Sequence, residues 1–255
     1  MARKVRPIGH DERLSLVEHL DELRTRLIVS LFAFGVALGL CFWQNHFLLD
    51  IVNDPLGERQ PITLGVGEPF MTTLTVSAYA AILIAMPVIL YQLYAFVLPA
   101  FSPTERKVAL PLLLMVPFLF VAGVAFAYFV VVPAALSFLL DFNQSEFNEQ
   151  IRARDYSGFF HLTLISVGLV FQLPVFILGM VRMGITTPAK LRKNRRYALL
   201  VCAVVAAALP GVDPVSMLIE MVPLVVLYEL SILLATVFGP RSSDVGDRVA
   251  SAEGS

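Results

Sequence analysis

The chain has 255 residues, of which 57% are hydrophobic and only 15% are charged, and its mean hydropathy is +0.76. Soluble domains are usually about 45–50% apolar and about 25% charged, so this composition excludes a disordered chain, a coiled coil and a secreted disulfide scaffold. Cys41 and Cys202 lie far apart in apolar segments and predict neither a disulfide framework nor a metal site. The composition predicts an all-α, polytopic membrane protein.

Six apolar segments are candidates to cross a bilayer, whose hydrocarbon core of about 30 Å needs about 20 residues per helix. They cover roughly residues 23–43, 71–98, 108–140, 156–181, 197–209 and 214–238. We expect residues 1–238 to form a single domain, followed by a small, polar, disordered tail at 239–255. Prolines inside the spans favour kinked helices in a curved bundle. These prolines are Pro87, Pro111, Pro117 and Pro133.

Lys and Arg are distributed unevenly between the two ends of the predicted spans. If the N-terminus is cytoplasmic, the inside segments carry 16 of these residues and the outside segments carry 3. Membrane proteins keep an excess of positive charge on the cytoplasmic side. Both termini of this six-span chain are therefore predicted to be cytoplasmic.

The fifth predicted span is short, because only thirteen residues, Tyr197–Leu209, separate Arg196 from Pro210. A helix of that length covers about 20 Å, which is less than the bilayer core. Together with the last helix it would form a short hairpin that thins the bilayer or packs against a partner. The alternative is a longer helix that includes part of the basic loop, with Arg195 and Arg196 snorkelling to the interface.

The N-terminal segment predicts a helix that carries acidic residues to the membrane interface. A capping box places the helix start at about Leu16, and Asp21 and Glu22 follow within two turns. Acidic residues are unusual there, since cytoplasmic flanks are usually basic. The simplest explanation is local pairing of Glu22 with Arg26 and of Asp21 with Arg24 along the helix.

A second helix start follows the second span. Ser102 is a suitable N-cap, Pro103 suits the first helical position and Glu105 completes a capping box. Glu105 therefore has a structural explanation as a cap. The functional alternative is that Glu22 and Glu105 form two anionic sites on one face, because carboxylates bind guanidinium groups in charge-assisted pairs. Two adjacent arginines of an extended peptide point to opposite sides and would need two separated carboxylates.

Polar side chains inside the spans are candidate functional groups. Gln172 lies midway along the fourth span, and Glu220 and Glu229 lie in the sixth. Each is expected to face the bundle interior or a wet cavity. The structural alternative, favoured for Glu220, is that these groups bond backbone carbonyls freed by Pro174 or Pro223.

The sequence contains none of the motifs GxxxxGK[ST], HExxH or GxSxG. We therefore do not expect an enzyme, and we expect no cofactor, no metal and no nucleic-acid partner. Asp213 precedes Pro214 and suits the N-cap of the last helix.

Several stretches occur in the order in which a known family carries them, over about residues 15–238. They are Glu18–Arg24, Tyr91–Phe101 with Glu105–Lys107, Phe126–Pro133, Met183–Thr187 with Leu191–Lys193, and the turn Pro210–Pro214. Through them the chain resembles the TatC family, the receptor component of the twin-arginine protein translocase.

The resemblance implies a six-helix, cup-shaped receptor in the bacterial plasma membrane, with both termini cytoplasmic and the last two helices short. It implies binding of twin-arginine signal peptides of folded cargo, recruitment of the single-span partners TatA and TatB, and transport driven by the proton-motive force. A homo-oligomer is compatible with it.

The resemblance also implies roles for individual residues, carried over by position. Glu22 and Glu105 match the arginine-binding carboxylates, and the signal-peptide site is expected to include Phe96, His19 and Arg106. The partner-contact region at the outer end is expected to include Asp213, Leu209 and Met217. This chain departs from many family members at Gln172, where they carry a glutamate; an amide can still hydrogen-bond but cannot titrate.

Two other functions remain open from the residues. A proton-coupled small-solute transporter would use Glu220 and Glu229, and it should concentrate its polar groups at midplane on broken helices. A structural scaffold for single-span partners would share the short terminal hairpin but bind no peptide.

Overall fold

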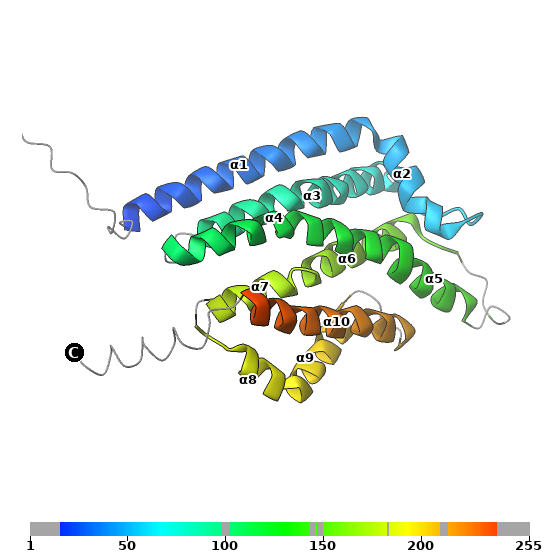
Figure 1. Cartoon of the computed structure of the whole chain (residues 1–255). Coiled ribbons are helices and arrows are strands. Elements are labelled where there is room, and N and C mark those ends of the chain that lie inside the picture. The colour runs from blue at the N-terminus through cyan, green and yellow to red at the C-terminus, as the bar shows by residue number, and fades with distance from the viewer. Residues whose placement is uncertain are drawn as a thin grey trace, which may run out of the picture.

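The computed structural model describes residues 16–97, 103–142, 146, 150–182, 184–209 and 214–238, without the side chains of 16–19, 97, 103–114 and 238. The described chain is helical, and its one backbone bridge pairs Ile62 with Arg152. The helices lie side by side from α1 at one edge to α8 and α9 at the other (Figure 1). Their bounds are α1 Leu16–Trp43, α2 Asn45–Asn53, η1 Asp54–Leu56, α3 Glu68–Val97, α4 Pro103–Phe126, η3 Ala127–Val131, α5 Val132–Asp141, α6 Ala153–Val170, α7 Leu173–Arg182, α8 Pro188–Lys193, α9 Arg195–Ala208 and α10 Pro214–Phe238.

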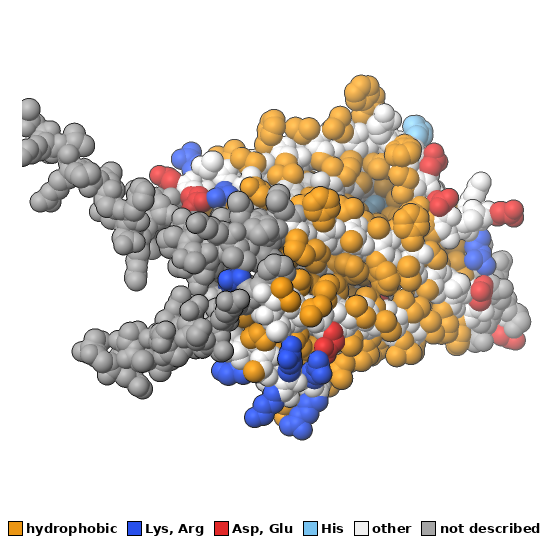
Figure 2. All heavy atoms as spheres, in the orientation of Figure 1, with side chains coloured by type: hydrophobic (Ala, Val, Ile, Leu, Met, Phe, Trp, Pro, Cys, Tyr) orange, Lys and Arg blue, Asp and Glu red, His pale blue; other side chains and the backbone are white. Residues whose placement is uncertain are grey.

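Five helical segments of the described chain are long and apolar enough to cross a membrane. They are Leu20–Trp43, Glu68–Phe96, Met115–Asp141, Ala153–Arg182 and Pro214–Val237. Hydrophobic side chains cover the middle of the visible face, and charged side chains gather towards its two ends and at α8 and α9 (Figure 2). Exposed apolar residues such as Leu31 and Phe32 are therefore lipid-facing positions rather than a defect of the core.

The first and second spans pack through small side chains. Ala37 and Cys41 of α1 form a buried cluster with Ala80, Ala81 and Ala85 of α3. Small residues let two helix backbones approach closely, which supplies van der Waals contact where lipid is as apolar as the side chains. The opposite side of α1 is left to the bilayer.

The third predicted span is one long helical rod with a change in winding. α4 begins at Pro103, the first helical position expected from the sequence, and η3 is a π-helical segment between α4 and α5. Pro133, the second residue of α5, has no N–H for the Phe129 carbonyl and would crowd it in an α-helix. The wider turn of a π segment relieves that contact.

The fourth predicted span is interrupted at its middle. α6 ends at Val170 and α7 begins at Leu173, with Phe171 and Gln172 in a turn between them. Pro174 cannot donate to the carbonyl of Val170, which explains why the regular ladder stops there.

The fifth predicted span forms a short helix, α9, which is not among the five described segments that are long and apolar enough to cross a membrane, so the prediction of six spans is not confirmed. The last helix, α10, has 25 residues and is therefore not short, contrary to what the resemblance implies. α9 has 14 residues and starts at Arg195, so it includes the two arginines of the alternative interpretation but gains only one residue in length. Asn194 lies in a turn that separates α9 from α8 and stops the helix from extending into the basic loop.

The first outer loop forms a cap of helix and turn on one end of the bundle. Val52 and Leu56 enter a core cluster with Val76, Phe160 and other residues of the spans. The hydroxyl of Tyr156 donates to the carbonyl of Val52 at 2.5 Å. We call this end, formed by residues 44–68 and 150–154, the outer end, after the predicted orientation, and the opposite end the inner end.

α4 and α6 cross closely at two glycines. A Cβ at Gly168 would lie 2.7 Å from a ring carbon of Phe120, and a Cβ at Gly123 would lie 2.9 Å from the Cα of Gly168. Neither position has room for a methyl group without a shift of the helices.

We predict that Gly168→Ala lowers the free energy of unfolding by about 1–3 kcal/mol, because the added methyl overpacks the α4–α6 contact. Thermal unfolding in detergent would measure it. Gly158→Ala in the same helix is the matched control, since its Cβ meets nothing within 4 Å. Equal melting temperatures for the two variants would contradict the prediction.

Candidate functional site

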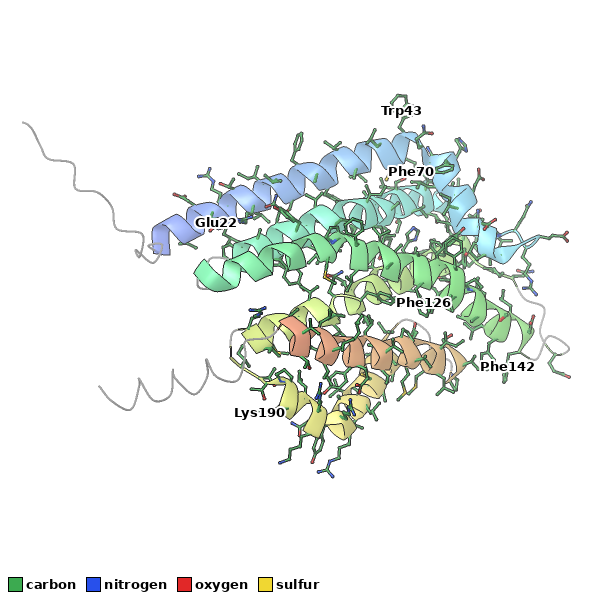
Figure 3. All side chains as sticks on the ribbon, viewed as in Figure 1. Glu22, Trp43, Phe70, Phe126, Phe142 and Lys190 are labelled. Carbon is green, nitrogen blue, oxygen red and sulfur yellow. The ribbon has the colours of Figure 1, made fainter. Side chains whose placement is uncertain are left out.

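The inner end of the bundle brings together the start of α1, the end of α3 and the start of α4 (Figure 1). Glu22 lies at this end, far from Trp43 and Phe70, which mark the other end (Figure 3). The polar side chains of this region lie where the apolar surface ends, as expected for a membrane–water interface.

Glu22, Arg26 and Gln92 form a hydrogen-bonded cluster between α1 and α3. The Nε and Nη2 atoms of Arg26 donate to one carboxylate oxygen of Glu22, at 3.1 and 2.5 Å. The Nη1 atom of Arg26 donates to the side-chain oxygen of Gln92 at 3.1 Å. The three side chains are partly buried. The arginine thereby links the first helix to the second span.

This cluster confirms one sequence-based pairing and corrects another. Glu22 pairs with Arg26, as the i,i+4 spacing indicates, but Asp21 and Arg24 form no ion pair among the described residues. A spacing of three residues permits contact on a helix without requiring it, and an exposed pair gains little from forming.

Gln92 was missed by the sequence reasoning. It is the only Gln, Asn or charged side chain between Glu68 and Val97, and an isolated polar residue in a span is the signal that could have identified it. Its partner could not be inferred, because Arg26 lies 66 residues away along the chain.

The other residues expected at the signal-peptide site are only partly described. Phe96 is partly buried, one residue before the end of α3. Glu105 is the third residue of α4, so its backbone holds the capping position that the sequence predicts. The side chains of Glu105, Arg106 and His19 lie outside the described residues.

Gln172 faces the protein interior, as expected, and is 5% exposed. Its amide nitrogen donates to the carbonyl of Val116 in α4 at 3.1 Å, so it joins two spans instead of bonding a carbonyl freed by Pro174 or Pro223. Its oxygen has no hydrogen-bond partner among the described residues. The amide suits this position because a neutral group costs far less to bury than a carboxylate.

Glu229 does not face the bundle interior, the first of the two settings expected for it. Its side chain is 45% exposed and accepts a hydrogen bond from Arg195 at 2.7 Å. The short helix α9 begins level with Glu229 and therefore places a cation beside it. Glu220 is 2% exposed, on the buried face of α10 that also holds Ser216 and Leu224.

The outer-end residues expected to contact partners lie at the α9–α10 hairpin. Met217 packs against a buried cluster of Cys202, Ala206 and Leu224 that joins the two helices. Leu209 follows the end of α9, and its N–H donates back to the carbonyls of Val205 and Ala206. Asp213 lies outside the described residues.

The fold and the site together define the class of protein: it is an α-helical, multi-pass membrane protein. Its described ion pairs lie at the two ends of the bundle and at the basic junction of α8 and α9. No group of three or more His, Cys, Asp or Glu that could hold a metal occurs in the described residues.

The model of the family described as TatC, Sec-independent protein translocase protein, matches residues 18–223. The chain is 36% identical to the TatC protein of Desulforapulum autotrophicum, over 94% of this chain and 91% of that one. It is 37% identical to the TatC protein of Carboxydothermus hydrogenoformans, over 91% and 96%.

Two solved structures of a twin arginine translocase receptor, TatC, share the fold. One has a TM-score of 0.71 at 33% identity and covers 87% of this chain and 99% of its own. The other, in DDM, has a TM-score of 0.74 at 34% identity, with 85% and 99% covered. The chain belongs to the TatC family and is a component of a Sec-independent protein translocase.

The Glu22–Arg26–Gln92 cluster predicts that Gln92→Leu loosens the inner end of α1. The variant removes the acceptor for Nη1 of Arg26, and losing one such hydrogen bond costs about 0.5–1.5 kcal/mol. Amide hydrogen exchange in the first turns of α1 should accelerate. Gln92→Glu keeps an acceptor, so the amides of α1 should exchange as slowly as in the parent protein. Equal exchange rates in Gln92→Leu and the parent protein would contradict the prediction.

Proposed function

We propose that this chain is the twin-arginine signal-peptide receptor of its translocase, with Glu22 and Glu105 as the carboxylates that bind the two arginines. The observation that carries the proposal is the environment of Glu22. This carboxylate lies at the inner rim and already accepts two N–H groups from a guanidinium, with a side-chain amide beside it. A surface that holds one arginine in this way has the chemistry to hold another.

Glu105 supplies the second carboxylate from a different helix. The start of α4 (Figure 1) lies at the same end of the molecule as Glu22, which Figure 3 labels in the same view. A glutamate at the third helical position can cap the helix with one oxygen and bind a guanidinium with the other. Phe96 at the end of α3 offers an aromatic face beside the site, where an arginine or an apolar signal residue would stack. His19 and Arg106 flank the two carboxylates in sequence.

The remaining steps combine the orientation that the charge distribution predicts with the partners and energy source that the resemblance to the TatC family implies. With both termini cytoplasmic in the bacterial plasma membrane, the signal peptide docks electrostatically at the inner rim. Its apolar segment then inserts along the exposed apolar surface. TatA- and TatB-like single-span proteins bind at the outer end near Leu209, Asp213 and Met217, and the proton-motive force drives transport. A homo-oligomer fits the same scheme.

The solute-transporter alternative is disfavoured by Glu229. Its side chain is 45% exposed and paired with Arg195, so it does not line an enclosed cavity, and the family is one of protein translocase components. The scaffold alternative differs from the receptor in one respect, since it requires no peptide binding at all.

We predict that Glu105→Ala weakens capture of a twin-arginine signal peptide. A hydrogen bond to a charged group contributes about 1.5–3 kcal/mol, so crosslinks from the arginine region of the peptide should fall roughly tenfold or more. Site-specific crosslinking in membranes would measure this.

Loss of the helix cap alone could cost about 0.5–2 kcal/mol in stability, so a second variant is needed. Glu105→Gln keeps a capping acceptor and removes the charge, and it should lower crosslinking while leaving thermal unfolding unchanged. Undiminished crosslinks in folded Glu105→Gln, or equal capture of a twin-lysine peptide, would contradict the receptor assignment and favour the scaffold.

The length of α9 predicts a locally thin bilayer. Its 14 residues span about 21 Å at 1.5 Å per residue, against a hydrocarbon core of about 30 Å. Glu229, which pairs with Arg195, lies nine residues before the end of α10. Nine helical residues rise about 13 Å, so this pair places polar groups about 13 Å further along the span than the end of α10.

Single cysteines along 188–209 should therefore be shielded from a water-soluble thiol reagent only within α9. The same scan along α1, whose apolar part has 24 residues, is the control and should give a longer shielded stretch. Shielding that continues over about 20 residues into α8 would contradict a thin bilayer.

A further inference from the structure

A pocket of about 790 Å³ opens at the outer end, between the first turns of α3 and α6. Its polar wall contains Arg152, Arg154, Thr72 and Tyr79. Its apolar wall contains exposed side chains of the outer loop and of α3, namely Leu64, Phe70 and Met71. Phe70 lies at the same end of the molecule as Trp43 (Figure 3), and exposed tryptophans collect at the level of lipid headgroups.

Glu68 is the acidic residue of the pocket, and its charge is already compensated. One carboxylate oxygen accepts from Nε of Arg152 at 2.7 Å. The other accepts from the backbone N–H groups of Leu64 and Gly65, at 2.9 and 3.1 Å. The glutamate therefore ties the outer loop to α6 and neutralises one of the two arginines.

Arg154 is exposed and forms no ion pair within the described residues, so the pocket retains one positive charge. This charge runs against the distribution of Lys and Arg in the rest of the chain, which favours the inner end. It lies in the first turn of α6 beside Asp155, which is exposed and does not line the pocket.

Two hydroxyl groups in the same pocket have unused hydrogen-bonding capacity. Thr72 is 7% exposed and its hydroxyl has no hydrogen-bond partner in the described part of the chain. Tyr79 is held by stacking on the buried ring of His161, with centroids 5.3 Å apart, and its hydroxyl likewise makes no hydrogen bond to any described residue. Buried polar groups are normally paired, so an unpaired hydroxyl in a pocket wall indicates a ligand with acceptor oxygens.

We propose that this pocket binds the phosphate headgroup of an anionic phospholipid, with Arg154 as the charge partner and Thr72 and Tyr79 as hydrogen-bond donors. The combination of a cationic, donor-rich wall with an exposed apolar wall fits a headgroup joined to acyl chains rather than a small soluble anion. With the orientation proposed above, the lipid comes from the outer leaflet. The site is separate from the inner rim and needs no signal peptide.

Native mass spectrometry of the purified full chain would test the proposal. The protein in detergent is titrated with phosphatidylglycerol or with phosphatidylcholine of the same acyl chains. We expect selective retention of phosphatidylglycerol, and Arg154→Gln should weaken it about fivefold, which corresponds to roughly 1 kcal/mol for one arginine at an anionic surface. Thr72→Val should weaken retention of both lipids, since their headgroups share the phosphate.

Arg59→Gln is the matched control. It removes one positive charge from the outer end, as Arg154→Gln does. Arg59 pairs with Asp141 at 3.8 Å and lies outside this pocket, so the Arg59→Gln variant should retain phosphatidylglycerol as the parent protein does. Thermal unfolding confirms that each variant is folded. Equal retention of the two lipids, or unchanged retention in folded Arg154→Gln, would overturn the proposal. If millimolar inorganic phosphate displaced bound phosphatidylglycerol as effectively as added lipid does, the occupant would not be a lipid and the proposal would be overturned.

Discussion

The cost of placing a charge or an unpaired peptide group in hydrocarbon constrains every part of this molecule. It requires helices, because only a helix satisfies its backbone within a single span. It also sends most ionisable side chains of the described residues to the helix ends, where some of them pair with one another. Among the described residues, Glu220 and His161 are exceptions, enclosed within the spans, and the neutral amide of Gln172 joins two spans.

The same constraint explains the structural role of three arginines. Arg26 links α1 to α3 at the inner end, Arg152 links α6 to the outer loop through Glu68, and Arg195 links α9 to α10. Apolar side chains supply little net attraction between helices in lipid, so polar contacts at the rims and small residues inside must set the packing. In the interior, small residues have this role at Gly123 and Gly168, where α4 crosses closely over α6.

Local features of the fold were predictable from the sequence, whereas long-range pairings were not. The helix start at Pro103, the short fifth helix and the Glu22–Arg26 pair follow from spacing and capping rules that act over a few residues. Partners separated by 66 or 84 residues, such as Arg26 with Gln92 or Arg152 with Glu68, depend on how the spans pack. The partner of Glu229 could not be predicted for the same reason, since Arg195 comes from another helix.

The internal guanidinium of Arg26 has a consequence for any arginine-bearing ligand of Glu22. Binding is then an exchange, in which an incoming guanidinium displaces or shares the contacts of a resident one. The net gain is the difference between two similar interactions, far smaller than either alone, and the resident arginine remains tethered nearby to compete for the carboxylate again. A site built in this way favours rapid release of an arginine-bearing ligand over tight retention, which is consistent with the receptor role proposed for this chain.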